Sequence, residues 1–148
     1  MSNESKIQYS DTLHVKDHCL CLHAQRAARA LARRFDNAFR HLNINNGQFS
    51  LLMALNRPEA PTIAPVAELL AMDRTTLTAA LKPLEKNGLV AIKPDEKDRR
   101  SRRLHLTEDG KALLSKALPI WIEEHEKLEA ELPDNMAEIL RTGLRAIA

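Results

Sequence analysis

Residues 62–90, TIAPVAELLAMDRTTLTAALKPLEKNGLV, predict two short helices joined by a tight turn. Thr62 is expected to cap the first helix and Asp73 the second, because a side-chain oxygen there can accept a free backbone N–H. Gly88 can take the left-handed conformation that ends the second helix. Pro83 lies inside that helix, where it removes one hydrogen bond. The inward face of the second helix carries leucines at spacings of four and three, namely Leu77, Leu81 and Leu84.

A charged hairpin is predicted directly after these helices. LVAIKP (89–94) and RRLHLT (102–107) have the composition of short strands, and the second run alternates Leu104 and Leu106 with basic residues. The loop between them, DEKDRRS (95–101), consists almost entirely of charged residues. Helix, turn, helix and charged hairpin together describe a winged helix-turn-helix, in which the second helix enters the major groove of DNA.

Further helices are predicted on both sides of this unit. The apolar residues from Thr12 to about Leu42 recur at helical spacing and predict one long amphipathic helix, and GQFSLLMAL (47–55) predicts a short one. Two more helices are expected at 107–130 and within 132–148. The last one has an apolar stripe of Met136, Ile139, Leu140, Leu144 and Ile147. A second copy of the chain could bury this stripe, so we expect a homodimer.

The fold class that follows is mainly α with a small β-hairpin wing. Residues 1–148 are expected to form a single domain. Within it, residues 45–107 would form the winged helix-turn-helix lobe, and residues 12–42 and 108–148 a helical dimerisation region.

Composition and charge restrict the class of protein. The 148 residues are 44% hydrophobic and 28% charged, and neither a run of about 18 apolar residues nor a signal-type N-terminus is present. We therefore expect a cytoplasmic protein without a membrane partner. Basic residues concentrate at 26–40 and 93–103, whereas acidic residues concentrate at 108–138. This asymmetry favours a polyanionic partner, although a charge run is more often a solvated surface.

The predicted DNA contacts are short hydroxyls and long cations on the second helix and the wing. Such groups suit phosphate oxygens and base edges. They are Arg74, Thr75, Thr76, Thr78, Lys82, Arg99, Arg100 and Arg102. Asp98 is expected to fix the wing by pairing with Arg100 or Arg102. The alternatives are a solvated hairpin with ion pairs and a winged-helix module that binds proteins and not DNA.

Catalysis is not expected. No glycine-rich phosphate loop, G-x-S-x-G or H-E-x-x-H pattern occurs. The acidic pair Glu123 and Glu124 lies among other acids, as on a solvated helix face. No cofactor is implied. RNA binding is disfavoured because only 3% of the residues are aromatic.

The wing segment DEKDRRSRRLHLTEDGKALL (95–114) resembles the wing signature of MarR-type transcriptional regulators, D-x-R followed by L-T and a glycine. The matching residues are Asp98, Arg100, Leu106, Thr107 and Gly110. The family often has Asp-Pro where this chain has Asp95-Glu96. The resemblance extends from about Asp17 to the C-terminus. It implies a homodimer that binds a pseudo-palindromic operator and is released by a small ligand or an oxidant.

The stretch DHCLCLHAQRAARAL (17–31) is the only one with the chemistry of a sensor. On a helix, Cys19 shares a face with His23, and His18 shares one with Cys21, but either pair supplies only two ligands of a metal site. No metal is therefore assigned. Small thiols that pack a helix interface are the simplest interpretation.

The same stretch also resembles the organic-hydroperoxide-sensing branch of the family, with Cys21 at the reactive position. That branch has tyrosines near the thiol, whereas the matching positions here are Asn46 and Phe49. A helix that starts near Thr12 would also place Cys21 beyond the first turn, where the N-terminal dipole has little effect.

We therefore favour a repressor released by a small organic ligand, with a thiol-based or metal-sensing repressor as the alternative. Apolar residues expected to line a ligand pocket are Phe49, Leu52, Met53 and Trp121. His23 or Arg26 could meet a carboxylate or phenolate of such a ligand.

Overall fold

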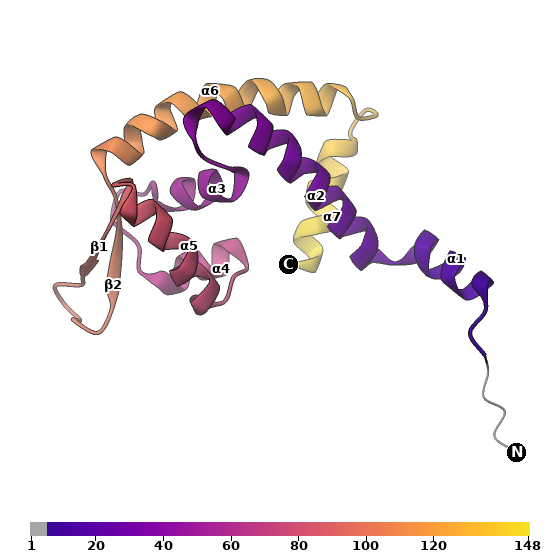
Figure 1. Ribbon diagram of the computed structural model, residues 1–148, viewed down its shortest axis with the longest axis horizontal. Coiled ribbons are helices and arrows are strands. Elements are labelled where there is room, and N and C mark those ends of the chain that lie inside the picture. The colour runs from indigo at the N-terminus through magenta and orange to yellow at the C-terminus, as the bar shows by residue number, and fades with distance from the viewer. Residues whose placement is uncertain (1–5) are drawn as a thin grey trace, which may run out of the picture. The chain divides into compact units, whose positions relative to one another are not determined.

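The computed structural model describes residues 6–148, which contain seven α-helices and one antiparallel hairpin (Figure 1). The mainly α fold class with a hairpin wing is confirmed. The chain divides between Arg34 and Phe35 into two compact units. No helix within residues 6–148 is long and apolar enough to cross a membrane.

The predicted single helix from Thr12 to Leu42 is wrong, because the structure has two helices there. Helix α1 covers Tyr9–His18 and α2 covers Leu20–Phe39, and the extended backbone of Cys19 separates them. The thiol of Cys19 accepts the N–H of Leu22 at 3.4 Å, as a capping group does. The apolar stripe itself begins at Leu20, and α1 has no buried residue. Packing therefore does not stabilise a continuous helix across Cys19.

Three short helices follow in the second unit: α3 (Asn46–Leu55), α4 (Ile63–Leu70) and α5 (Arg74–Lys86). Asp73 caps α5 through the N–H of Thr76 at 2.7 Å, and Gly88 takes the expected left-handed conformation, with φ 74°. Pro83 lies within α5 without ending it. Thr62 occupies the N-cap position of α4, but its side chain makes no capping hydrogen bond, contrary to expectation.

Strands β1 (Val90–Pro94) and β2 (Arg102–Leu106) form the wing, which projects beyond α4 and α5 in Figure 1. Val90 pairs with Leu106, and Ile92 pairs with Leu104. Leu104 is fully buried in the core, so the predicted inward face of the second strand is correct. The opposite face of β2 carries Arg103 and His105, as the alternation requires.

The long helix α6 (Glu108–Ala130) starts at the end of the wing and packs against α3, and α7 (Met136–Ile147) follows it. Thr107 caps α6 by accepting the N–H of Gly110 at 3.0 Å. The core lies between α3, α4, α5, the wing and α6, and its fully buried side chains include Phe39, Leu52, Val66, Leu77, Leu81, Leu84 and Leu104. Four residues of the apolar stripe of α7 remain exposed in the single chain, namely Ile139, Leu140, Leu144 and Ile147.

Candidate DNA-binding surface

The exposed face of α5 carries the residues predicted to contact DNA. Leu77, Leu81 and Leu84 are buried on the other side of the helix and hold it against the core. All five predicted contacts on α5 are exposed: Arg74, Thr75, Thr76, Thr78 and Lys82. The helix therefore presents hydroxyls and cations outward from a rigid support, as major-groove recognition requires.

The start of α5 is fixed by the carboxylate of Asp73. The backbone N–H of Thr76 is the main cause that lowers the pKa of Asp73, and the Thr76 side chain lowers it further. Asp73 is therefore charged at neutral pH and holds the first turn of α5.

The tip of the wing is ordered by Asp98. One carboxylate oxygen accepts the backbone N–H of Arg100 at 3.1 Å, and the other accepts the Ser101 hydroxyl at 3.4 Å. Asp98 thus holds the turn of the wing loop through the backbone of Arg100 and the hydroxyl of Ser101. The expected pairing with an arginine side chain is replaced by this turn, which leaves Arg99, Arg100 and Arg102 exposed.

Three predicted cations from two segments converge on one small hollow. Its volume is about 160 Å³, and its lining includes Arg74 of α5, Arg100 and Arg102 of the wing, and Thr62 at the start of α4. Three guanidinium-bearing residues around one hollow suit a phosphate group of the DNA backbone. The helix-turn-helix and the wing therefore form one continuous surface.

Two residues that hold the wing were missed by the sequence interpretation. Arg103 donates from its guanidinium to the backbone oxygen of Ala60 at 2.8 Å and pairs with Asp95 at 3.4 Å. The alternation of β2 places Arg103 opposite the buried Leu104, but no sequence signal connects it to a loop 43 residues earlier.

The predicted ligand-pocket residues are only partly brought together. Phe49, Met53 and Trp121 line an apolar hollow of about 400 Å³ between α3, α4 and α6. Its other lining residues are Ser50, Ala54, Leu69 and Leu118. Leu52 does not line it, because it points into the core and is fully buried. His23 and Arg26 are exposed on α2 in the first unit.

The two thiols flank the start of α2. Cys19 is partly buried at the N-cap position, and Cys21 is exposed in the first turn. The expectation that Cys21 lies far from a helix N-terminus is therefore wrong, because α2 starts at Leu20 and not near Thr12. The rings of His18 and His23 bond to backbone oxygens, at 2.8 Å from His14 and 2.7 Å from Cys19. Within residues 6–148 no group of three or more potential metal ligands occurs.

Comparisons with known proteins identify the family. The family model "MarR family" matches residues 44–101, the helix-turn-helix and most of the wing. The "Organic hydroperoxide resistance transcriptional regulator" of Bacillus subtilis is 35% identical over 108 residues, which are 72% of this chain and 74% of the relative. The chain belongs to the MarR family. A second MarR-family relative is the HTH-type transcriptional regulator PecS of Dickeya dadantii. It is 32% identical over 125 residues, which are 82% of this chain and 73% of the relative.

Solved structures agree with this assignment. The transcriptional regulator MosR of M. tuberculosis, in complex with DNA, matches with a TM-score of 0.76 and 32% identity, over 87% of this chain and 96% of its own. The repressor CouR, bound to a DNA duplex, matches with a TM-score of 0.80 and 26% identity, over 97% of this chain and 99% of the CouR chain. This MarR-family chain is a DNA-binding transcriptional regulator, and α5 and the wing carry its candidate DNA-binding surface.

Proposed function

We propose that this MarR-family protein is a cytoplasmic homodimeric repressor that leaves its operator when an apolar, aromatic small molecule binds between α3 and α6. We infer that it acts by binding alone, without a catalytic step. The observation that carries the effector class is the apolar hollow beside Trp121, where Phe49 and Trp121 face each other with ring centroids 6.5 Å apart.

The homodimer is supported by apolar residues that a single chain leaves in water. Ile139, Leu140, Leu144 and Ile147 of α7 are between 46% and 70% exposed. Leu20 and Leu31 of α2 are exposed as well. Contiguous apolar faces of this kind mark protein interfaces, and a two-fold dimer would place two wings and two recognition helices on successive half-sites.

The hollow favours a flat apolar effector. Ser50 supplies the only hydroxyl among its lining side chains, and none of these side chains is charged. A volume of about 400 Å³ lies within the usual range for small-molecule sites. A strongly charged ligand would lose its hydration there without gaining a partner.

DNA binding is tested by sequencing genomic fragments that the pure protein retains, and then by titrating salt on the enriched fragment. Affinity should fall steeply between low and moderate salt because several phosphates are neutralised at once. A protein that retains no fragment, or binds with an affinity independent of salt, would refute the assignment.

The effector site is tested through Trp121, which is the only tryptophan of the chain and therefore a specific fluorescent reporter. Aromatic compounds that quench it should also release the enriched fragment. Ser50→Phe should abolish both effects, because Ser50 is exposed at the rim and a larger side chain there would block the hollow. Release that persists in this variant would place the effector elsewhere.

Thiol-based release is the second candidate function. It is favoured by the exposed Cys21 in the first turn of α2, since a helix N-terminus stabilises a negatively charged group. The 35% identity to an organic hydroperoxide resistance regulator also supports it. Hydroperoxide that releases DNA from the parent but spares Cys21→Ser would establish this mechanism.

A further inference from the structure

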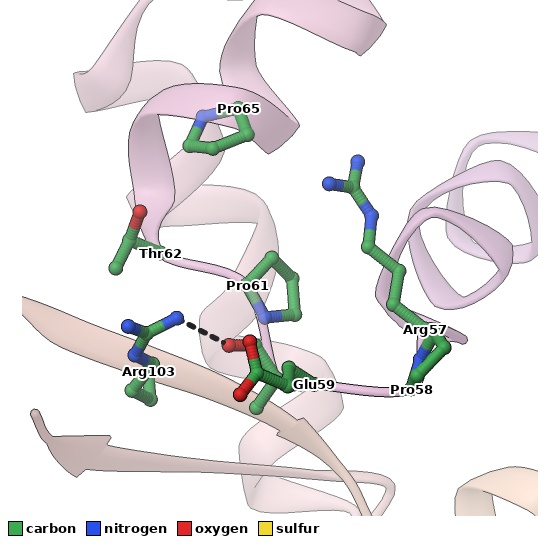
Figure 2. Close-up of a pocket in the computed structure, with 8 residues that line it drawn as sticks. Arg57, Pro58, Glu59, Pro61, Thr62, Pro65 and Arg103 are labelled. Carbon is green, nitrogen blue, oxygen red and sulfur yellow. Dashed lines mark hydrogen bonds between the residues drawn. The ribbon is translucent and has the colours of Figure 1, made fainter.

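One polar side chain of the wing, Arg103, bonds to the loop that precedes α4. One guanidinium nitrogen donates to the backbone oxygen of Ala60, in the loop between α3 and α4, at 2.8 Å. The other pairs with a carboxylate oxygen of Asp95, at the start of the wing loop, at 3.4 Å. Figure 2 shows the guanidinium directed from β2 toward the loop that carries Glu59 and Pro61.

Asp95 continues this connection into the wing loop. Its second carboxylate oxygen accepts the N–H of Lys97 at 3.3 Å, and its own N–H donates to the backbone oxygen of Ser101 at 3.0 Å. The Lys97 N–H is the main cause that lowers the pKa of Asp95, and Arg103 adds to it against the opposing effect of burial. The carboxylate therefore remains charged at neutral pH and can hold both partners.

The backbone of β2 reinforces the attachment at the same place. The N–H of Leu104 donates to the oxygen of Pro61 at 2.8 Å, and Thr62 forms an isolated bridge with Arg103. These contacts hold the middle of β2, but they do not reach the wing loop. Among the hydrogen bonds of residues 6–148, it is the guanidinium of Arg103 that joins the loop of Ala60 to the carboxylate that organises Lys97.

We propose that Arg103 is a positioning residue that sets the angle of the wing on DNA without contacting DNA itself. The side chain does not line the hollow where Arg74, Arg100 and Arg102 converge. It lines two other hollows, on the side of Glu59 and Lys93. This inference rests on the proposed DNA-binding function and adds to it the residue that orients one of its two reading elements.

Lysine could not replace arginine here. The planar guanidinium presents donors in a fixed fork, which fits two acceptors held by two different loops. A lysine ammonium is a compact charge whose three N–H donors rotate on a flexible stem, so it would not hold both acceptors in a fixed geometry. Arg103→Lys should therefore keep the charge of the parent and lose the wing geometry.

The test uses the full chain and a DNA fragment selected from a random library by the parent protein. Affinity is measured for Arg103→Gln, Arg103→Lys, Asp95→Asn and the double variant Asp95→Asn/Arg103→Gln. Lys93→Gln is the matched control, because Lys93 pairs with Arg103 across the hairpin, is exposed, and has the same charge. Chemical unfolding of each variant and hydroxyl-radical footprinting accompany the titrations.

Arg103→Gln and Asp95→Asn should each weaken binding by about tenfold, the loss expected when one charge-assisted hydrogen bond no longer orders the wing. Footprints should lose the protection given by the wing and keep that given by α5. The double variant should lose no more affinity for DNA than the single variant with the larger loss, since both changes break the same connection. Arg103→Lys should resemble Arg103→Gln, and Lys93→Gln should resemble the parent.

Full affinity in Arg103→Gln would overturn the inference, as would additive losses in the double variant. Recovery of the parental footprint in Arg103→Lys would show that charge alone matters and would also overturn it. If Arg103→Gln proves unstable, Asp95→Asn and Arg103→Lys still decide the question through their footprints. A parent that selects no fragment would instead refute the DNA-binding function.

Discussion

Gly110→Ala should destabilise the protein, because the third residue of α6 lies against the base of the wing. A Cβ atom at this position would overlap the backbone oxygen of Leu89 and lie 2.8 Å from a methyl carbon of Leu106. The oxygen of Leu89 also accepts the N–H of Thr107 at 3.1 Å, so it cannot move without weakening that bond. The start of α6 would therefore have to move away from the hairpin.

The magnitude follows from two opposing terms. Overpacking of a well-packed site costs about 1–3 kcal/mol, and a clash with backbone belongs at the upper end of that range. Replacing glycine with alanine inside a helix stabilises the folded state by about 1 kcal/mol. The free energy of unfolding should therefore fall by about 2 kcal/mol.

Urea unfolding followed by circular dichroism, at one fixed protein concentration, measures this loss. Gly47→Ala is the matched control, because Gly47 also lies in the first turn of a helix, and a Cβ there meets only Asn45 Oδ1 at 3.4 Å. Gly88→Ala has open space but a φ of 74°, and it should cost about 1 kcal/mol. A Gly110→Ala variant as stable as Gly47→Ala would refute the predicted close approach.

Three further predictions concern DNA and the thiol. The double variant Arg99→Ala/Arg100→Ala should weaken operator binding at least about tenfold. Its free energy of unfolding should not change, because both side chains are exposed at the tip of the wing. Unchanged affinity would show that the wing is not part of the DNA-binding surface. Arg74→Ala should weaken specific and random DNA alike, whereas Thr75→Ala should relax base preference by about 1–3 kcal/mol; equal losses from both would mean that neither reads bases. Stoichiometric hydroperoxide should leave operator binding intact in the parent and in Cys21→Ser, and release from the parent alone would assign the signal to the thiol.

The helix-turn-helix could be predicted because its signals are local. Asp73 and Gly88 lie at the ends of α5 and act on neighbouring backbone, and the leucine spacing identifies the buried face of the same helix. The strand alternation likewise identifies Leu104 as inward without knowledge of any distant residue. Each feature depends on residues within one or two turns, which is the range over which sequence patterns are informative.

The features that could not be predicted depend on distant partners or on the absence of one. The bond from Arg103 to Ala60 joins residues that are far apart in the sequence. Whether Leu52 faces the core or the hollow likewise depends on helices that are distant in the sequence. The break at Cys19 has no proline or glycine to announce it. The break lies before the first residue of the apolar stripe. A prediction from helical spacing therefore extends α2 too far toward the N-terminus, because it accepts polar residues within a helix.

The proposed effector hollow and the wing are connected through α3 and the loop that follows it. Phe49 and Met53 of α3 line the hollow opposite Trp121 of α6, and α3 then runs into the loop whose Ala60 oxygen receives Arg103. A ligand that widens the space between α3 and α6 would displace that loop, because close-packed helices move as rigid bodies. The displacement would reach the wing through the Arg103 guanidinium. A ligand bound beside Trp121 would then misalign the wing relative to α5, and the same ligand should lose its effect on DNA once the connection is already broken in Arg103→Gln.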